Sequence, residues 1–529
     1  MNGSVRRLLA ILCFSFLVVA VSFSQFGPTP HGFPVDDPVI RNIWAEAMDS
    51  SQLENLAHHL LDVIGPRLVG TPQMGQAHSW VEKQYHDWGI EAKNEAWGKW
   101  RGWERGATRV DLLEPRVRSL EAIMLAWSPP TKKNGVTAGL ITLADCKDSL
   151  EFLRWLPSVK GKIVLVSQPQ LTGRPDKNWE EFGTKESFDT LKALRKIATD
   201  AWSLRIRHTG FKADTLPNIV EQAGAVGVLT NRWSQGWGVD KVFGCTTKNI
   251  PVVDVSLEDY NLLWRFVDYN DKPIVRIVTE SKFLDPAETM NTLGTIRGKE
   301  KSDEYVMLSA HLDSWDAGSG ATDNGTGSIL TMEVMRILKK YYPNPKRTIM
   351  VGHWGSEEQG LNGSRAFVAD HPEIVAKLQA LFNQDNGTGR IANIGAQGLI
   401  DAGAHLARWI SRIPTQVTTD VKLSFPGLPM GGGSDNAPFI AAGAPGFGLG
   451  SNTWDYFLYT WHTNRDTYDK LVFDDLRNNV VLTACLVYLA SEDPEFIPRD
   501  RRDMPIESRT GKPRPWPEPH EPQRAGGLK

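Results

Sequence analysis

The sequence is poor in cysteine, and its few cysteines are too scattered for a disulfide framework or a zinc finger. Cys13, Cys146, Cys245 and Cys485 are the only four in 529 residues, and no two form a Cys-x-x-Cys pair. Disulfide-rich secreted domains and zinc fingers need denser, regular spacing. The fold must therefore depend on a hydrophobic core, for which a content of 41% hydrophobic residues is ordinary.

An excess of charge of either sign is also missing. The 59 Lys and Arg residues nearly balance 62 Asp and Glu residues, so the formal net charge is −3. Proteins that bind nucleic acid need a basic surface to neutralise phosphates. We therefore expect no nucleic-acid partner.

Three common catalytic signatures are absent as well. The chain contains no Gly-x-Ser-x-Gly turn, no phosphate-binding P-loop and no His-Glu-x-x-His helix. Their absence argues against serine hydrolases of the common type, nucleotide hydrolases and single-zinc proteases.

A short apolar segment opens the chain. Arg6 and Arg7 precede an apolar run of 16 residues from Leu8 to Phe23, and Ser22-Phe23-Ser24 has the small-x-small pattern of a cleavage site. This run is shorter than the roughly 20 residues that span a bilayer. We predict a cleaved signal peptide, a secreted or periplasmic location and no membrane span after cleavage; a retained anchor is the alternative.

The pattern of apolar residues changes along the chain. Helical spacing comes first, short strand-like runs recur between about residues 137 and 280, and strands alternate with amphipathic helices after residue 295. This alternation predicts an α/β fold with a mainly parallel central sheet, helices on both faces and an inserted β-rich domain. The expected parts are a signal peptide (1–24), the main domain (25–136 and 284–496), the insert (137–283, with a charged, helix-like stretch at 176–212) and a proline-rich polar tail (497–529).

Histidine and acidic residues follow the predicted strands at their carboxyl ends. Because parallel strands end at one edge of a sheet, where α/β proteins bind ligands, we expect these side chains to converge. Carboxylates that lie close together keep one another protonated unless a cation compensates. The pattern therefore indicates a metal site. The residues are His311, Asp313, Asp323, Glu357, Glu358, Asp385 and His462.

Zinc suits this mixture of imidazole and carboxylate better than calcium or magnesium, which prefer oxygen ligands alone. Two ions about 3.5–4 Å apart would share one carboxylate. Asp323, Glu358 and Asp385 carry −3 against +4 for two zinc ions, and one bridging hydroxide brings the site to neutrality. Glu357 then remains free to act as a base.

Each of these residues also has an ordinary structural explanation. His311 and His462 could be buried histidines bonded to the backbone, Asp323 could cap a helix and Asp385 could belong to a turn. The two adjacent glutamates could be solvated surface charge. A metal site is favoured because it explains all of them together.

The motifs around these residues resemble the co-catalytic zinc exopeptidases, a family of bacterial aminopeptidases and, more closely, plasma-type glutamate carboxypeptidases. The motifs occur in the family's order and cover most of the chain. They are DVIGPRLVGT, SAHLDSWDAGSGATDNGTG, GHWGSEEQGLNGSRAF, FNQDNGTG, GGGSDNAPF and WHTNRDTYD.

The resemblance implies a ligand set for two Zn²⁺ ions per chain. Asp323 would bridge both ions, with Glu358 and His462 completing one site and His311 and Asp385 the other. Relatives of this kind form homodimers, so a homodimer is possible.

The resemblance also implies roles for residues that do not bind metal. Glu357 would be the general acid/base, Asp313 would fix the His311 imidazole, and the insert would be a protease-associated-type lid. The family often has tyrosine before the last histidine, where this chain has Trp461.

The glycine-rich run Gly431–Asp435 allows two interpretations. It is either a helix-entry turn capped by Ser434 or Asp435, or a pocket wall in which Gly432, Gly433 and Ser434 meet a substrate terminus.

We therefore expect an exported zinc-dependent exopeptidase that hydrolyses terminal peptide bonds of dipeptides or short peptides through a metal-bridging hydroxide. A glutaminyl cyclase-like zinc enzyme and a receptor-like relative without catalysis are the alternatives. Amino-terminal and carboxyl-terminal specificity are both compatible with these residues.

Overall fold

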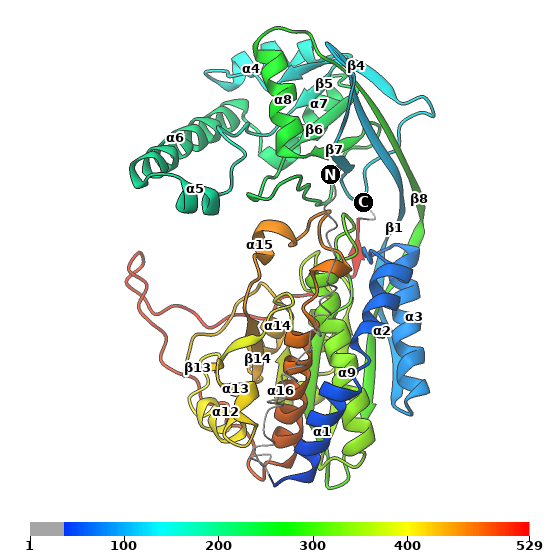
Figure 1. Ribbon diagram of the computed structural model, residues 1–529, viewed down its shortest axis with the longest axis vertical. Helices are drawn as coiled ribbons and strands as arrows, with labels where there is room; N and C mark the ends of the chain where they lie inside the picture. The colour runs from blue at the N-terminus through cyan, green and yellow to red at the C-terminus, as the bar shows by residue number, and fades with distance from the viewer. Residues whose placement is uncertain (1–35, 528–529) are drawn as a thin grey trace, which may run out of the picture.

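The computed structural model describes residues 36–527, so the predicted signal peptide (1–24) lies outside the described residues. Figure 1 shows an upper part with β4–β7 and α4–α8, which we call the insert, and a lower main domain. The long strands β1 (Glu91–Glu114) and β8 (Ile274–Ile296) pair antiparallel and run through both parts. Within residues 36–527, no helix has the length and apolar character needed to cross a bilayer.

The main domain is built on four parallel strands in the order β14-β11-β9-β10. β8 and β12 flank them and run antiparallel to β10 and β14. The predicted α/β fold is confirmed, and its central strands are parallel as expected. The flanking strands are antiparallel, and β8 is so because it returns from the insert against the direction of β10. The remaining strands are β2 (Arg118–Leu120), β3 (Ala122–Met124), β4 (Val136–Thr142), β5 (Ile163–Leu165), β6 (Gly227–Thr230), β7 (Val252–Val255), β9 (Lys301–His311), β10 (Arg347–Trp354), β11 (Leu378–Asn383), β12 (Ile391–Gly395), β13 (Lys422–Ser424), β14 (Gly446–Ser451) and β15 (Ala525–Gly526).

Helices cover both faces of this sheet. Successive side chains of a strand point to opposite faces, and because both sets are apolar here, both faces must be buried. Val306 and Leu308 of β9 enter the core formed with α9 and α16, whereas Met307 enters the opposite core with α10 and α14. Strands buried on both faces read as continuous apolar runs, which is how they appear in the sequence. The main-domain helices are α1 (Pro38–Asp49), α2 (Leu53–Ala57), η1 (His58–Ile64), α3 (Pro72–Asp87), η4 (Ala321–Gly325), α9 (Thr326–Tyr341), α10 (Asn362–Asp370), α11 (Pro372–Ala376), α12 (Ala402–Ile410), α13 (Thr415–Thr418), α14 (Asn436–Ala441), α15 (Tyr456–Tyr459), η5 (Tyr468–Lys470) and α16 (Phe473–Glu492).

The insert is an α/β unit rather than the β-rich domain expected. Its parallel strands β5, β6 and β7 span only 3, 4 and 4 residues, whereas α6 alone spans 25. α6 forms from the charged stretch because Thr184 caps its N-terminus and Gly210, at φ +77°, ends it in a left-handed conformation. The insert helices are α4 (Ser149–Trp155), η2 (Leu156–Val159), α5 (Asp176–Phe182), α6 (Lys185–Thr209), η3 (Ala213–Thr215), α7 (Leu216–Gln222) and α8 (Leu257–Asp268).

The C-terminal tail is extended and attached to the main domain. Trp516 packs against the core and donates a hydrogen bond to the carbonyl of Ile440, and Lys99 N–H donates to the carbonyl of Arg524. A Cβ at Gly98 would lie 2.5 Å from that same Arg524 carbonyl oxygen, so glycine permits the close approach.

Candidate metal centre

The five candidate ligands converge at the carboxyl ends of the parallel strands. His311 ends β9, Glu358 follows β10 and Asp385 follows β11. Asp323 lies in the turn η4 before α9, and His462 follows the short helix α15. Strand direction therefore brings together residues up to 151 positions apart, as the sequence pattern predicted.

The ligands form two groups that share Asp323. His311 Nε2 lies 3.2 Å from Asp385 Oδ1 and 3.4 Å from Asp323 Oδ1. His462 Nε2 lies 3.0 Å from Glu358 Oε2 and 3.3 Å from Asp323 Oδ2. In each group the ligand atoms lie within 4.8 Å of one another. Asp323 thus directs one carboxylate oxygen into each group, which is the geometry of a bridging ligand.

Burial makes this cluster of acids dependent on positive charge. Burial, assisted by the charge of Asp323, raises the pKa of Glu358 to about 7. Burial alone would lower the pKa of His462, but Glu358 and Asp323 raise it to about 9. Burial likewise opposes ionisation of Asp323, yet the His311 and His462 imidazoles hold its pKa well below the usual value. The imidazolium charges occupy the role that metal cations would fill.

The donor set fits zinc. Asp323 Oδ2 is buried without a hydrogen-bond partner, so one lone pair is free for coordination. Each group combines one imidazole nitrogen with two carboxylates, which are common zinc ligands. Each group offers three ligand atoms, the number of protein ligands that catalytic zinc sites use.

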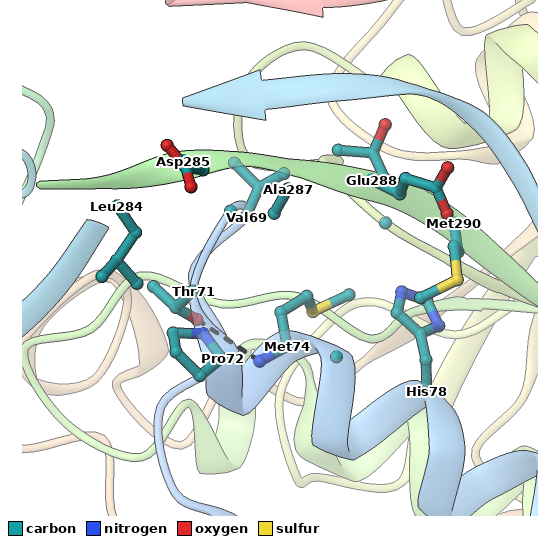
Figure 2. A pocket seen from close by; sticks show the side chains of 14 residues that line it. Val69, Thr71, Pro72, Met74, His78, Leu284, Asp285, Ala287, Glu288 and Met290 are labelled. Atoms are coloured by element: carbon teal, nitrogen blue, oxygen red, sulfur yellow. Dashed lines mark hydrogen bonds between the residues drawn. The ribbon is translucent and has the colours of Figure 1, made fainter. Parts of the chain in front are cut away.

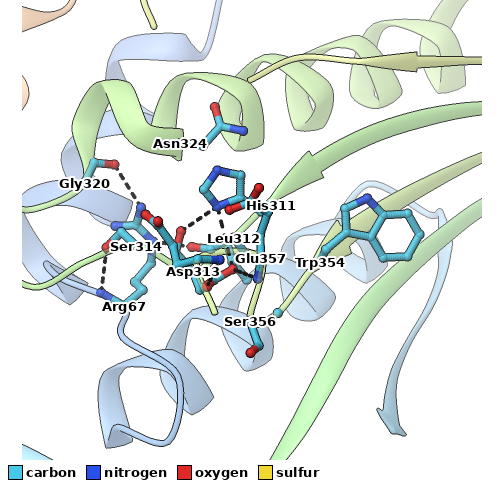
Figure 3. Close-up of polar contacts among 12 residues, drawn as sticks. Arg67, His311, Leu312, Asp313, Ser314, Gly320, Asn324, Trp354, Ser356 and Glu357 are labelled. Atoms are coloured by element: carbon cyan, nitrogen blue, oxygen red, sulfur yellow. Dashed lines mark hydrogen bonds and ion pairs between the residues drawn. The ribbon is translucent and has the colours of Figure 1, made fainter. Parts of the chain in front are cut away.

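Asp313 contacts both the first histidine and the glutamate loop (Figure 3). Its carboxylate accepts hydrogen bonds from the backbone N–H groups of Glu357 at 3.0 Å and Glu358 at 3.3 Å. His311 Nδ1 lies 2.9 Å from the Asp313 carbonyl oxygen but 3.6 Å from its carboxylate Oδ1. The main-chain carbonyl therefore orients the imidazole, and the Asp313 carboxylate holds the loop that carries both glutamates.

Glu357 lies close enough to His311 and Asp385 for their charges to act on its carboxyl group, but it belongs to neither ligand group. Its burial, with the nearby charge of Asp385, raises its pKa well above the usual value, although His311 opposes this shift. A carboxyl group with a raised pKa is suited to accept and release a proton.

The glycine-rich run leads into α14, and its Ser434 hydrogen-bonds to the ligand candidate Asp385. Ser434 Oγ donates to Asp385 Oδ2 at 2.5 Å and accepts from Asn383 Nδ2 at 2.7 Å. A Cβ added at Gly432 or Gly433 would meet no atom within 4 Å, so these residues face open space. Neither Ser434 nor Asp435 makes a side-chain cap at α14.

A buried arginine in the first motif was not predicted to have a role in the site. Arg67 is 0% exposed, and its guanidinium binds the loop between His311 and Asp323 (Figure 3). Burial lowers its pKa to about 10, so it remains charged at neutral pH. Arg67 lies in the motif DVIGPRLVGT, which could have drawn attention to it. Its partners are main-chain carbonyls, however, and these leave no pattern in a sequence. The guanidinium donates to the carbonyls of Gly65 (2.8 Å), Leu312 (2.7 Å), Ser319 (2.7 Å) and Gly320 (2.9 Å).

Asp466, in the last motif, fixes the turn that carries Asp323, the candidate shared by both groups. Its carboxylate accepts from the backbone N–H groups of Thr322 at 2.7 Å and Asp323 at 3.0 Å, and from the Thr322 hydroxyl at 2.8 Å. It lies four residues after His462, so it ties the segment carrying one ligand to the turn carrying another.

Replacing Asp466 with alanine is expected to lower zinc affinity by about 10- to 100-fold, the usual effect of removing a hydrogen-bond partner that orients a metal ligand. Competition with a chromophoric chelator measures this change. The exposed Asp469, replaced by alanine, is the matched control and should leave the affinity unchanged. Equal affinities for Asp466→Ala and the wild type would contradict the positioning role.

The insert contacts the metal centre directly through the segment around Lys241. Val242 N–H donates to the carbonyl of His462, and Lys241 and Thr463 form an antiparallel bridge. The Phe243 ring lies 5.0 Å from the His462 ring, and Trp461 stacks on that imidazole at 3.9 Å. The insert therefore packs on the loop that presents the last ligand.

A separate cavity of about 210 Å³ lies between α3 and β8 (Figure 2). Met74, His78 and Met290 line it, and it contains none of the metal-ligand candidates. Burial lowers the pKa of His78 to about 3, so its imidazole is neutral, with Nδ1 2.8 Å from the Thr292 hydroxyl. This mainly apolar cavity supplies no group to the metal centre.

Comparisons with known proteins agree with this geometry. The model of Peptidase family M28 matches residues 291–486. Carboxypeptidase Q of Rattus norvegicus is 26% identical, over 83% of this chain and 85% of that protein, and that of Homo sapiens is 25% identical, over 83% and 85%.

Solved structures share the fold. A peptidase M28 precursor from Shewanella amazonensis matches with a TM-score of 0.65 and 22% identity, over 87% of this chain and 97% of that one. BSAP, a zinc aminopeptidase from Bacillus subtilis, matches with a TM-score of 0.53 and 21% identity, over 84% and 95%. All five ligand candidates lie within residues 291–486, the segment similar to Peptidase family M28, and this similarity agrees with the resemblance seen in the motifs.

Proposed function

We propose that this protein is a zinc-dependent exopeptidase that hydrolyses terminal peptide bonds of dipeptides or short peptides. The sharing of Asp323 between two ligand groups is the observation that carries the proposal, because it fits two cations at one hydrolytic centre. Relatives named carboxypeptidase and aminopeptidase favour action at chain ends.

Different residues of the chain would bind the metals, transfer the proton and position the base. Two zinc ions, when bound, would acidify a water molecule and polarise the scissile carbonyl. Glu357 would accept the proton of the attacking water and deliver it to the leaving amine. Asp313 holds Glu357 in place through its backbone N–H, and His311, Asp323, Glu358, Asp385 and His462 would hold the metals.

Two further parts of the chain support the same function. We propose that residues 1–24 direct export of the protein, on the strength of their basic and then apolar pattern. The insert would act as a protease-associated-type lid, a role supported by its contact with the His462 loop.

Metal removal combined with a substrate panel tests the proposal. We expect the purified protein to contain two zinc ions per chain, to lose dipeptide hydrolysis on chelation and to regain it when zinc is restored. Elemental analysis and amino-acid release with free, acetylated and amidated dipeptides measure this. Full activity of the zinc-free protein would contradict the proposal, and a pyroglutamyl product from an N-terminal glutaminyl peptide would favour cyclisation.

A further inference from the structure

The cavity between α3 and β8 contains an imidazole and two thioether side chains that the metal centre does not use (Figure 2). Met74 and His78 lie four residues apart on α3, the spacing that places two side chains on one face of a helix. Met290 belongs to β8, and all three side chains line this cavity of about 210 Å³. In Figure 2 the ends of both methionines are directed toward the His78 imidazole. One nitrogen and two sulfur ligands are therefore available to a single small volume.

A chain of hydrogen bonds fixes which nitrogen of His78 carries the proton. Because a carboxylate only accepts, Asn94 presents Nδ2 to Glu82 at 2.7 Å and keeps Oδ1 as an acceptor. The Thr292 hydroxyl donates to Asn94 Oδ1 at 2.6 Å, so its oxygen is left to accept from His78 Nδ1–H at 2.8 Å. Since burial lowers the pKa of His78 to about 3, the ring is neutral. Its Nε2 atom therefore carries a lone pair and no proton.

This lone pair is buried and has no partner among residues 36–527. His78 is 1% exposed, and its Nε2 forms no hydrogen bond there. Gly355 leaves the space beside it open, because a Cβ at Gly355 would lie 3.4 Å from Nε2 and 3.5 Å from Met74 Cε. Leaving a buried acceptor unpaired costs free energy. Histidines that bind metals generally have this arrangement, in which one ring nitrogen donates to a protein acceptor and the other is free for the ion.

We propose that Met74, His78 and Met290 bind one Cu(I) ion in this cavity. Thioether sulfur is a soft ligand that selects Cu(I), and imidazole nitrogen also suits copper. Zinc sites in proteins use thiolate, imidazole and carboxylate instead, so this site and the metal centre select different ions. Asp285 and Glu288, which are exposed and also line the cavity, form no ion pair with residues 36–527. Their negative charge favours entry of a cation.

Methionine-to-leucine substitutions in the zinc-loaded protein test the assignment. Leucine has nearly the volume of methionine and lacks the sulfur, so Met74→Leu and Met290→Leu should keep the fold. Met335→Leu is the matched control, because Met335 is a buried methionine of α9 that does not line the cavity.

Competition with bicinchoninate, under ascorbate and without oxygen, measures the affinity for Cu(I). The wild type and Met335→Leu should each bind one ion per chain with equal affinity. Met74→Leu and Met290→Leu should each bind it at least about 10-fold more weakly, since the loss of even an outer partner of a metal ligand has an effect of this size. Zinc content should be the same in all four proteins.

Methionine methyl signals identify the ligands directly. In protein labelled with ¹³C at the methionine methyl groups, one equivalent of Ag(I), a redox-inert analogue of Cu(I), should shift the two signals that are missing from Met74→Leu and Met290→Leu. The Met335 signal should not move.

Two results would overturn the assignment. Equal Cu(I) affinity of the wild type and both cavity variants would assign the ion to the free cysteines Cys146, Cys245 and Cys485. Unshifted Met74 and Met290 signals in the presence of Ag(I) would leave the His78 lone pair to a water molecule. Neither measurement depends on peptide hydrolysis, so failure of this assignment and failure of the proposed function are separate results.

Discussion

Replacing Glu357 with glutamine is expected to lower kcat by about 10²- to 10⁴-fold while zinc content stays at the wild-type value. Glutamine preserves the size of the side chain and the backbone N–H bond to Asp313, but it cannot accept and release the proton of the attacking water. Steady-state hydrolysis of a dipeptide, with elemental analysis of the same samples, measures both quantities.

The control for this substitution is Glu373→Gln, which removes an exposed carboxylate of the main domain that belongs to neither ligand group. It should leave kcat unchanged. Undiminished hydrolysis by Glu357→Gln would remove the base assignment, and loss of zinc from that variant would instead show that Glu357 is a ligand.

Replacing Asp323 with alanine is expected to remove both zinc ions, because this carboxylate contributes one oxygen to each ligand group. Replacing Glu358 or Asp385 removes a ligand from one group only, so each of these variants should retain about one zinc ion per chain. Elemental analysis after dialysis against a weak chelator separates these outcomes.

The exposed Asp420, replaced by alanine, is the control and should leave two ions in place. Two zinc ions per chain in Asp323→Ala would refute the bridging role. Equal zinc loss in Asp323→Ala and Glu358→Ala would also count against it, because the pattern of one shared and four unshared ligands predicts a difference.

The metal centre could be predicted from the sequence because each ligand lies next to a recognisable helix or strand. His311 ends an apolar strand, Asp385 follows another, and Asp323 precedes the helix α9, whose residues 326–335 are all buried. Local pattern and strand direction are sufficient to bring such residues together. In the insert only the charged stretch at 176–212 was expected to be helix-like, so α4, α7 and α8 were not predicted.

The contacts that support the metal ligands could not be predicted from the sequence in this way. Arg67 binds four main-chain carbonyls, and carbonyls are present at every residue, so no sequence pattern marks its partners. The pairing of Lys241 with Thr463 joins segments 222 positions apart with no shared periodicity. The antiparallel position of β8 depends on the path of the chain through the insert, which local propensity does not encode.

The pairing of the insert with the His462 loop has a mechanical consequence. Because Val242 N–H donates to the His462 carbonyl and the Phe243 ring packs against both His462 and Trp315, a hinge motion of the insert along β1 and β8 would displace the loop that carries one ligand candidate. If the insert moved to admit a peptide, the same motion would displace His462. Substrate entry and metal binding by His462 would then place opposite requirements on the contact between the insert and this loop.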